Sequence, residues 1–361
     1  MMQKKTVAII SLSIFIALCW AFILAVKWTD KTVYVYAHNF ESSPGVRLMD
    51  PNQVIFEIIS QGTNRVNVKW DKTEIYHKGR CCVKMRENSP NVQVLAQVND
   101  GESYPLVIDS GATKYLAATD SLVLDAGLEI FPIDELGKNI GGICHLDQLK
   151  IGNLTIVLPA CEYWLAHYER RVLGLTIWKE KKLNLCLNLM KEFSYILFDN
   201  VNREVEFATN NSFNPQDSNQ WHQYPMTIEH DEKHKARLIV DIAIAGRPHH
   251  IEFDTGASPG LILTDNIWSK FSCGLQIRLQ EKGQLKTPLS GWLPCRTITV
   301  EKITLGNISI NDARIHVIAD DNPFGQDEFT LGTGFFKETV IVLDFEHNLL
   351  WVSNPLQPAA L

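Results

Sequence analysis

The sequence predicts an all-β body of two homologous lobes that follows a membrane-spanning helix. Three observations lead to this prediction: a duplicated series of strand and turn segments, an acidic turn at the same place in each copy, and an uncharged N-terminal stretch. Of the 361 residues, 45% are hydrophobic and 21% are charged, so the chain can bury a large core. The formal charge of -7 argues against nucleic acid as a partner, because phosphate binding needs a basic face.

The N-terminal stretch, residues 6–26, contains no charged side chain. As a helix it would be about 31 Å long, at about 1.5 Å per residue, which is enough to cross a bilayer. Lys4 and Lys5 precede it, so we expect residues 1–5 to be a cytoplasmic tail and the body to lie outside the cytoplasm, in a periplasm, a lumen or the extracellular space. The alternative is a cleaved signal peptide, which would make the protein secreted.

Residues 27–90 are interpreted as a stem or a removable pro-segment, with strand candidates at 53–59 and 64–70. The repeat begins after this stem. Residues 92–112 and 237–257 both follow the order strand, glycine turn, strand and acidic turn.

A short helix is expected after each acidic turn, begun by a Thr-Asp pair and ended by Gly127 or Gly274. Further similar segments follow in the same order in both copies, so we expect lobes at 91–209 and 237–355, joined by a polar linker at 210–236. These further pairs are 149–156 with 303–310, 172–178 with 330–336, and 194–208 with 339–353.

The two acidic turns read "DSGAT" from Asp109 and "DTGAS" from Asp254. A single turn of this kind would be weak evidence, because Asp-Ser-Gly and Asp-Thr-Gly are common in surface turns. Two copies at equivalent places predict that Asp109 and Asp254 face each other between the lobes. Two carboxyl groups a few Å apart share one proton. One can then draw a proton from water while the other protonates a carbonyl oxygen.

At these residues the chain resembles the bilobal pepsin-like aspartic proteases, and the Ala of each motif is similar to that of the retropepsins. The resemblance covers most of residues 91–355. It implies six-to-eight-stranded acid-protease lobes related by pseudo-twofold symmetry, and an aspartic-type endopeptidase that hydrolyses peptide bonds without a cofactor or a metal. It makes Asp109 and Asp254 catalytic. It also implies that the other residues of the two acidic turns hold the carboxyl groups in place: Ser110, Gly111, Thr113, Thr255, Gly256 and Ser258. In each lobe it further implies a strand behind the turn in which an apolar residue is followed by glycine, at Leu173 and Gly174 and at Leu331 and Gly332.

The resemblance further implies a mobile hairpin that covers the cleft. In the first lobe the corresponding residues are 137–152, where Gly141 and Gly142 suit a mobile tip although no Tyr is present. Gly291 and Trp292 occupy the equivalent part of the second lobe. For Trp292 the alternative is a side chain that fills core space.

Seven cysteines follow the uncharged stretch, and an exported chain can form disulfides. The odd count leaves at least one thiol unpaired within the chain. Cys144 and Cys161 are the favoured pair, since they flank a hairpin turn at Gly152. Cys273 and Cys295 are a weaker second pair.

Two further functions stay open. One is a catalytically inactive protease-fold protein that binds peptides or acts as a scaffold at the membrane. The other is a metalloenzyme that uses His230 and His234 of the linker, although their order is not the HExxH of metalloproteases. Peptide or protein substrates and the membrane are the expected partners, and we expect a monomer.

Overall fold

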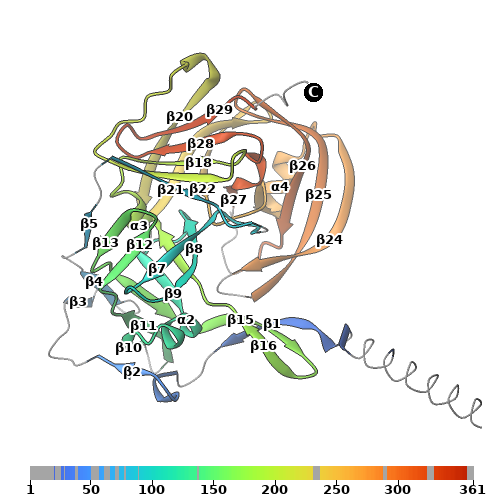
Figure 1. The fold of residues 1–361 in the computed structure, drawn as a ribbon. Helices are drawn as coiled ribbons and strands as arrows, with labels where there is room; N and C mark the ends of the chain where they lie inside the picture. The colour runs from blue at the N-terminus through green and yellow to red at the C-terminus, as the bar shows by residue number, and fades with distance from the viewer. Residues whose placement is uncertain are drawn as a thin grey trace, which may run out of the picture.

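The computed structural model is built almost entirely of β-strands, as the ribbon shows (Figure 1). The predicted all-β class is therefore confirmed. The structure describes residues 20, 26–27, 29–36, 40–49, 57–60, 66–69, 73–76, 79–87, 89–135, 138–230, 236–287, 291–322 and 329–355.

No helix in the described part of the chain is both long and apolar enough to cross a membrane. The predicted anchor, residues 6–26, falls outside the described residues except at Trp20 and Val26. The prediction of a transmembrane helix and of a membrane location is therefore corrected to this extent: the described residues contain no such helix.

The first half of the body forms an 11-stranded sheet. At its centre β17 (Leu183–Cys186) lies between two neighbours, parallel to β8 (Ser103–Asp109) and antiparallel to β9 (Leu116–Thr119). The other strands are β2 (Arg47–Leu48), β5 (Glu74–Tyr76), β7 (Gln93–Val98), β10 (Glu129–Glu135), β11 (Lys138–Cys144), β12 (Gln148–Ile151), β13 (Leu154–Val157) and β14 (Cys161–Trp164).

The second sheet has 13 strands, of which ten come from residues 221–353 and three come from 79–84, 195–199 and 204–209. Here β27 (Phe329–Gly332) takes the place that β17 has in the first sheet, parallel to β22 (Arg247–Asp254) and antiparallel to β23 (Leu261–Thr264). The other strands are β6 (Gly79–Lys84), β18 (Tyr195–Asp199), β19 (Glu204–Thr209), β20 (Trp221–His230), β21 (Ala236–Ile244), β24 (Ile277–Thr287), β25 (Gly291–Leu305), β26 (Ile308–Ile318), β28 (Val340–Asp344) and β29 (Leu349–Ser353).

The predicted linker, 210–236, is not only a connection. Within it β20 pairs with β29 on one side and with β21 on the other, so this segment contributes a strand to the second sheet. The reason is the apolar alternation of Tyr224 and Met226, whose side chains are buried between exposed neighbours.

The predicted stem, 27–90, is likewise part of the body. Strand β1 (Lys31–Tyr36) pairs with β15 (Ala166–Val172), β2 with β10, β5 with β13, and β6 with β19. Two short strands in this region, β3 (Glu57–Ser60) and β4 (Val66–Lys69), pair only with each other. Strands β1, β15 and β16 (Leu175–Lys179) form a three-stranded sheet, which we call the arm and which projects from the body in Figure 1.

Short helices follow the acidic turns at the predicted places. α2 spans Asp120–Asp125 and α4 spans Asp265–Phe271, and neither cap threonine makes a side-chain cap hydrogen bond. Gly127 and Gly274 come just after them with positive φ angles of 62° and 90°, which glycine adopts without strain. The remaining helical segments are α3 (Leu187–Met190), η1 (Phe40–Ser42), η3 (Ser218–Gln220) and η4 (Thr333–Phe335).

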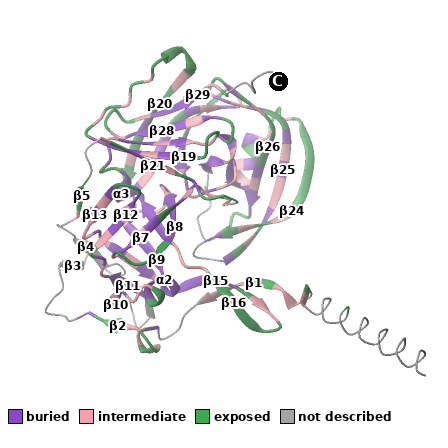
Figure 2. Cartoon of the chain, viewed as in Figure 1, coloured by how far each residue is buried: buried purple, intermediate pink, exposed green. Residues whose placement is uncertain are grey.

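The core runs through both sheets, as the buried strands of Figure 2 show. The residues that precede the two acidic turns, Ile108 and Phe253, have no exposed surface, and the strands behind them bury Leu185 and Leu331 equally. Burying apolar side chains of this size stabilises the fold by about 1.5–3 kcal/mol each. The ends of β8 and β22 are therefore held rigidly where the carboxyl groups emerge.

Candidate functional site

The structure brings the two acidic turns together. Asp109 is the last residue of β8 and Asp254 is the last residue of β22. Behind them, Cys186 of β17 lies in register with Asp109, and Gly332 of β27 lies in register with Asp254. The strand that pairs in parallel with β8 or β22 therefore supports the carboxyl group at its end.

Ser110 and Thr255 join the two turns through four hydrogen bonds. The Ser110 amide donates to Thr255 Oγ1 at 3.0 Å, and the Thr255 amide donates to Ser110 Oγ at 2.9 Å. Each hydroxyl then donates across the interface to a backbone carbonyl, Ser110 to Phe253 at 2.7 Å and Thr255 to Ile108 at 2.8 Å. Both side chains are fully buried, so this network fixes the separation of the carboxyl groups.

Glycine is required on both turns because the opposite carboxyl group lies so close. A Cβ atom on Gly111 would be 2.5 Å from Asp254 Cγ, and one on Gly256 would be 2.5 Å from Asp109 Oδ1. The Gly111 and Gly256 amides instead donate to Asp254 Oδ1, at 3.2 and 2.7 Å.

Each carboxyl group lies against the opposite turn, close enough to affect the pKa of the other. Burial raises the pKa of Asp254 well above its usual range, and the neighbouring Asp109 charge raises it further. Burial also raises the pKa of Asp109, while Lys182 and hydrogen bonds from its neighbours oppose this. Such a pair holds one proton. Chemically, its ionised member can draw a proton from water or accept a hydrogen bond from an N–H group, and its protonated member can donate to a carbonyl oxygen.

Two asparagines, which no sequence motif indicated, complete the surroundings of the pair. Asn184 of β17 donates from Nδ2 to Asp109 Oδ2 at 2.5 Å, and Asn91 donates from Nδ2 to the Gly256 carbonyl at 2.7 Å. Both come from segments far along the chain from the turns they contact. Only the strand order of the first sheet places Asn184 beside Asp109.

Both carboxyl groups open into a cleft of about 1760 Å³, lined by residues from both halves of the body. The cleft wall mixes charged side chains with aromatic ones. The aromatic side chains are Trp164, Tyr168, Trp178, Trp292 and Phe335.

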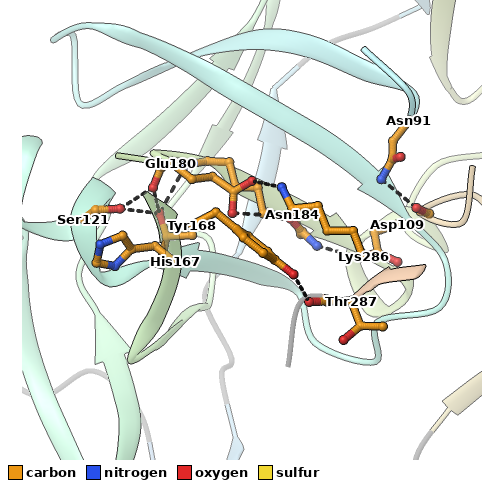
Figure 3. A network of polar contacts seen from close by, with 12 residues as sticks. Asn91, Asp109, Ser121, His167, Tyr168, Glu180, Asn184, Lys286 and Thr287 are labelled. Carbon is orange, nitrogen blue, oxygen red and sulfur yellow. Dashed lines mark hydrogen bonds and ion pairs between the residues drawn. The ribbon is translucent and has the colours of Figure 1, made fainter. Parts of the chain in front are cut away.

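One end of the cleft is bridged by side chains that the sequence did not single out (Figure 3). The Tyr168 hydroxyl of the arm donates to the Thr287 carbonyl, at the end of β24, at 2.8 Å. Lys286 Nζ lies 3.8 Å from the centre of the Tyr168 ring and 3.1 Å from Glu180 Oε1. We call Tyr168, Glu180, Lys286 and Thr287 the cross-cleft contact. It ties the arm to the β24–β25 hairpin.

The remaining predicted turn residues have simpler roles. Thr113 offers its backbone carbonyl to Asn188 Nδ2 at 2.5 Å, and Ser258 lines the cleft.

One of the two predicted apolar-glycine strands is misplaced. Leu331 and Gly332 lie behind the second turn, in β27. Leu173 and Gly174, in contrast, form the turn between β15 and β16, with positive φ angles of 52° and 79°, and Leu173 is 46% exposed. The strand behind Asp109 is β17, whose residues are all buried. The sequence similarity of "VLG" and "TLG" therefore matched a surface turn with a core strand.

The predicted mobile tip of the first half is also wrong. Gly141 and Gly142 lie within β11, between β10 and β14, and do not line the cleft. A Cβ atom on Gly141 would meet the Tyr163 carbonyl at 2.1 Å, so these glycines serve close strand packing. Gly291 begins β25 with a φ angle of 72°, and the adjacent Trp292 lines the cleft with its ring 5.9 Å from that of Tyr168.

Neither predicted disulfide is present. All seven cysteines in the described residues are free. Cys144 and Cys161 lie opposite each other on β11 and β14, but as buried thiols, and burial raises the pKa of Cys161 well above its usual range. Cys273 is exposed after α4, whereas Cys295 is buried in β25.

The structure does not support a metal site in the part of the chain it describes, where no group of three or more His, Cys, Asp or Glu side chains could hold an ion. His230 ends β20, and His234 lies outside the described residues.

No family model and no curated protein matches the chain. Solved structures do match it. Basic 7S globulin from soybean is 12% identical, with a TM-score of 0.41, and conglutin gamma, a basic 7S globulin from lupine seeds, is 11% identical, with a TM-score of 0.41. Each match covers 78% of this chain and 95% of the other.

These comparisons correct the family assignment made from the sequence. The similar structures reported above are named as 7S globulins, and no family model places the chain among the aspartic proteases. The assignment to that family is corrected accordingly, and so is the classification as an aspartic-type endopeptidase. At this level of similarity the two globulins give no information about what this chain binds.

Proposed function

We propose that this protein binds extended peptide segments in the cleft between its two halves, and that the paired carboxyl groups of Asp109 and Asp254 hydrogen-bond the backbone of the bound segment. The observation that carries the proposal is the geometry of the pair: each carboxyl group lies against the opposite turn, and both line the cleft. Two carboxyl groups this close share one proton. A peptide group presents one donor, its N–H, and one acceptor, its C=O. A carboxyl pair with one proton offers the complementary acceptor and donor.

The size of the cleft supports a chain-like ligand. Its volume of about 1760 Å³ exceeds the roughly 300–1,000 Å³ typical of small-molecule sites. Its lining also alternates polar and aromatic groups, which suits side chains of mixed character better than one compact molecule.

The proposal includes two homologous lobes, 91–209 and 237–355, related by a pseudo-twofold axis. It is supported by the matching strand relations on the two sides. β17 relates to β8 and β9 as β27 relates to β22 and β23. The Ser110 and Thr255 hydrogen bonds are reciprocal in the same way.

A binding experiment with the full-length protein tests the proposal. The protein is incubated with a random library of eight-residue peptides, captured peptides are identified by mass spectrometry, and the tightest is titrated by calorimetry. Asp109→Asn is expected to weaken binding by at least about 10-fold, because it removes a charged hydrogen-bond acceptor. Asp147→Asn, at an exposed carboxylate outside the cleft, is the control and should bind as the wild type does.

Three results would overturn this proposal. Two are the absence of any captured peptide and equal binding by the Asp109→Asn variant. The third is recovery of peptides cut at one bond in a reaction that needs both Asp109 and Asp254, which would replace binding with hydrolysis as the function of the cleft.

A further inference from the structure

The two carboxyl groups lie in different surroundings although their turns match. Two residues before Asp109, Val107 lies in register with Asn184 of β17. Two residues before Asp254, Glu252 lies in register with Thr330 of β27. The two halves therefore place different side chains at the same position beside the pair.

The charges around Asp109 favour its ionised form. Asn184 is 3% exposed and donates to Asp109 Oδ2 at 2.5 Å. Lys182, two residues earlier on the chain and on the same wall of the cleft, adds a positive charge. A hydrogen bond donated to a carboxylate and a nearby cation both stabilise the negative charge.

The surroundings of Asp254 act in the opposite sense. Glu252 lies two residues before it on β22 and faces the same cleft, so its carboxylate opposes a second negative charge there. Arg237 donates from Nε to Glu252 Oε2 at 2.7 Å, which holds the Glu252 carboxylate in place on β22. The Gly111 and Gly256 amides reach Asp254 Oδ1, but they are neutral donors that also tolerate a protonated carboxyl group.

We propose that Asn184 is a positioning residue that makes Asp109 the ionised member of the pair and leaves the shared proton on Asp254. The inference rests on the proposed peptide-binding function and adds the chain direction in which the bound peptide lies. Asp109 accepts an N–H group of the bound segment, and Asp254 donates to a carbonyl oxygen. A peptide can then lie in the cleft in only one of its two chain directions.

The placement of the proton is tested first on the free protein. Aspartate carboxyl carbons are labelled with ¹³C and their NMR shifts are followed with pH in the wild type, in Asn184→Leu and in Asn200→Leu. Asn200 is the matched control, because it does not line the cleft and donates to the Phe336 and Thr339 carbonyls rather than to either carboxyl group of the pair. The wild type and the control should show one carboxyl that stays ionised and one that stays protonated near neutral pH. In Asn184→Leu the pKa values of the two carboxyl groups should lie closer together than in the wild type.

Peptide binding gives the second readout. With the best binder of the library, Asp109→Asn should weaken binding at least about 10-fold more than Asp254→Asn does, because Asp109→Asn removes the charged acceptor whereas Asp254→Asn replaces one neutral donor with another. In the Asn184→Leu background this difference should shrink to about 3-fold or less. Thermal unfolding first establishes that each variant is folded.

The outcomes separate the two proposals. If the carboxyl titrations of Asn184→Leu match the wild type, or if the 10-fold difference persists in that background, the role of Asn184 is refuted while peptide binding stands. If no peptide binds the wild type but the titrations change as expected, the proton placement stands, whereas the peptide direction falls with the proposed function.

Discussion

Replacing Thr255 with Val should destabilise the protein by about 2–4 kcal/mol, although the two side chains have nearly the same shape. The change removes the acceptor of the Ser110 amide and the donor to the Ile108 carbonyl, both of which are buried. A buried donor or acceptor left without its partner costs about 1–3 kcal/mol. Two such groups give the expected range, because some relaxation of the turns reduces the sum.

The assay is urea denaturation followed by tryptophan fluorescence, with the free energy of unfolding compared at equal m-value. Thr227→Val on the exposed face of β20 is the control, and its effect should be within about 0.5 kcal/mol. The double variant Ser110→Ala/Thr255→Val should lose less than the sum of the single changes, because each single change already breaks the shared network. An effect of Thr255→Val no larger than that of the control, or strict additivity, would refute this account of the turns.

Three further predictions concern the same region. Because the pKa of Asp254 is raised in the folded state, the folded protein holds an extra proton, and its stability falls as the pH rises above the unfolded pKa of 3.8 towards the folded pKa. Asp254→Asn should therefore gain stability relative to the wild type as the pH rises above 3.8, measured by denaturation at each pH. Gly256→Ala should destabilise by about 1–3 kcal/mol or more, because its Cβ would lie 2.5 Å from Asp109 Oδ1; an unchanged melting temperature would contradict this. Tyr168→Phe removes the hydrogen bond to the Thr287 carbonyl, so peptide association measured by stopped flow should become faster, and an unchanged rate would show that this contact does not limit entry.

The acidic turns could be predicted from the sequence because their chemistry is local. Each turn is a continuous stretch of chain in which a strand is followed by Asp, a small hydroxyl residue and glycine. The presence of a second copy indicated that the two turns face each other. Asn184 could not be found in this way. Its position beside Asp109 depends on β17 inserting between β8 and β9, a long-range pairing that leaves no motif.

The misplaced strand at Leu173 has a related cause. The arm segment 166–179 stands between β14 and β17, and it carries an apolar-apolar-Gly sequence of its own. Alignment of short motifs selected this turn, in which Leu173 is exposed, instead of β17, in which Leu183 and Leu185 are buried. Tyr168 was missed for the same reason, since the arm was matched to the wrong element.

The pairing of β1 with β15 links the start of the described fold to the cleft mechanically. β1 runs antiparallel to β15 along its whole length, with Tyr34 opposite Tyr168. Tension applied to the chain before Lys31 would strain the backbone hydrogen bonds between β1 and β15 together, and it would reach the end of β24 through the hydrogen bond from Tyr168 to the Thr287 carbonyl.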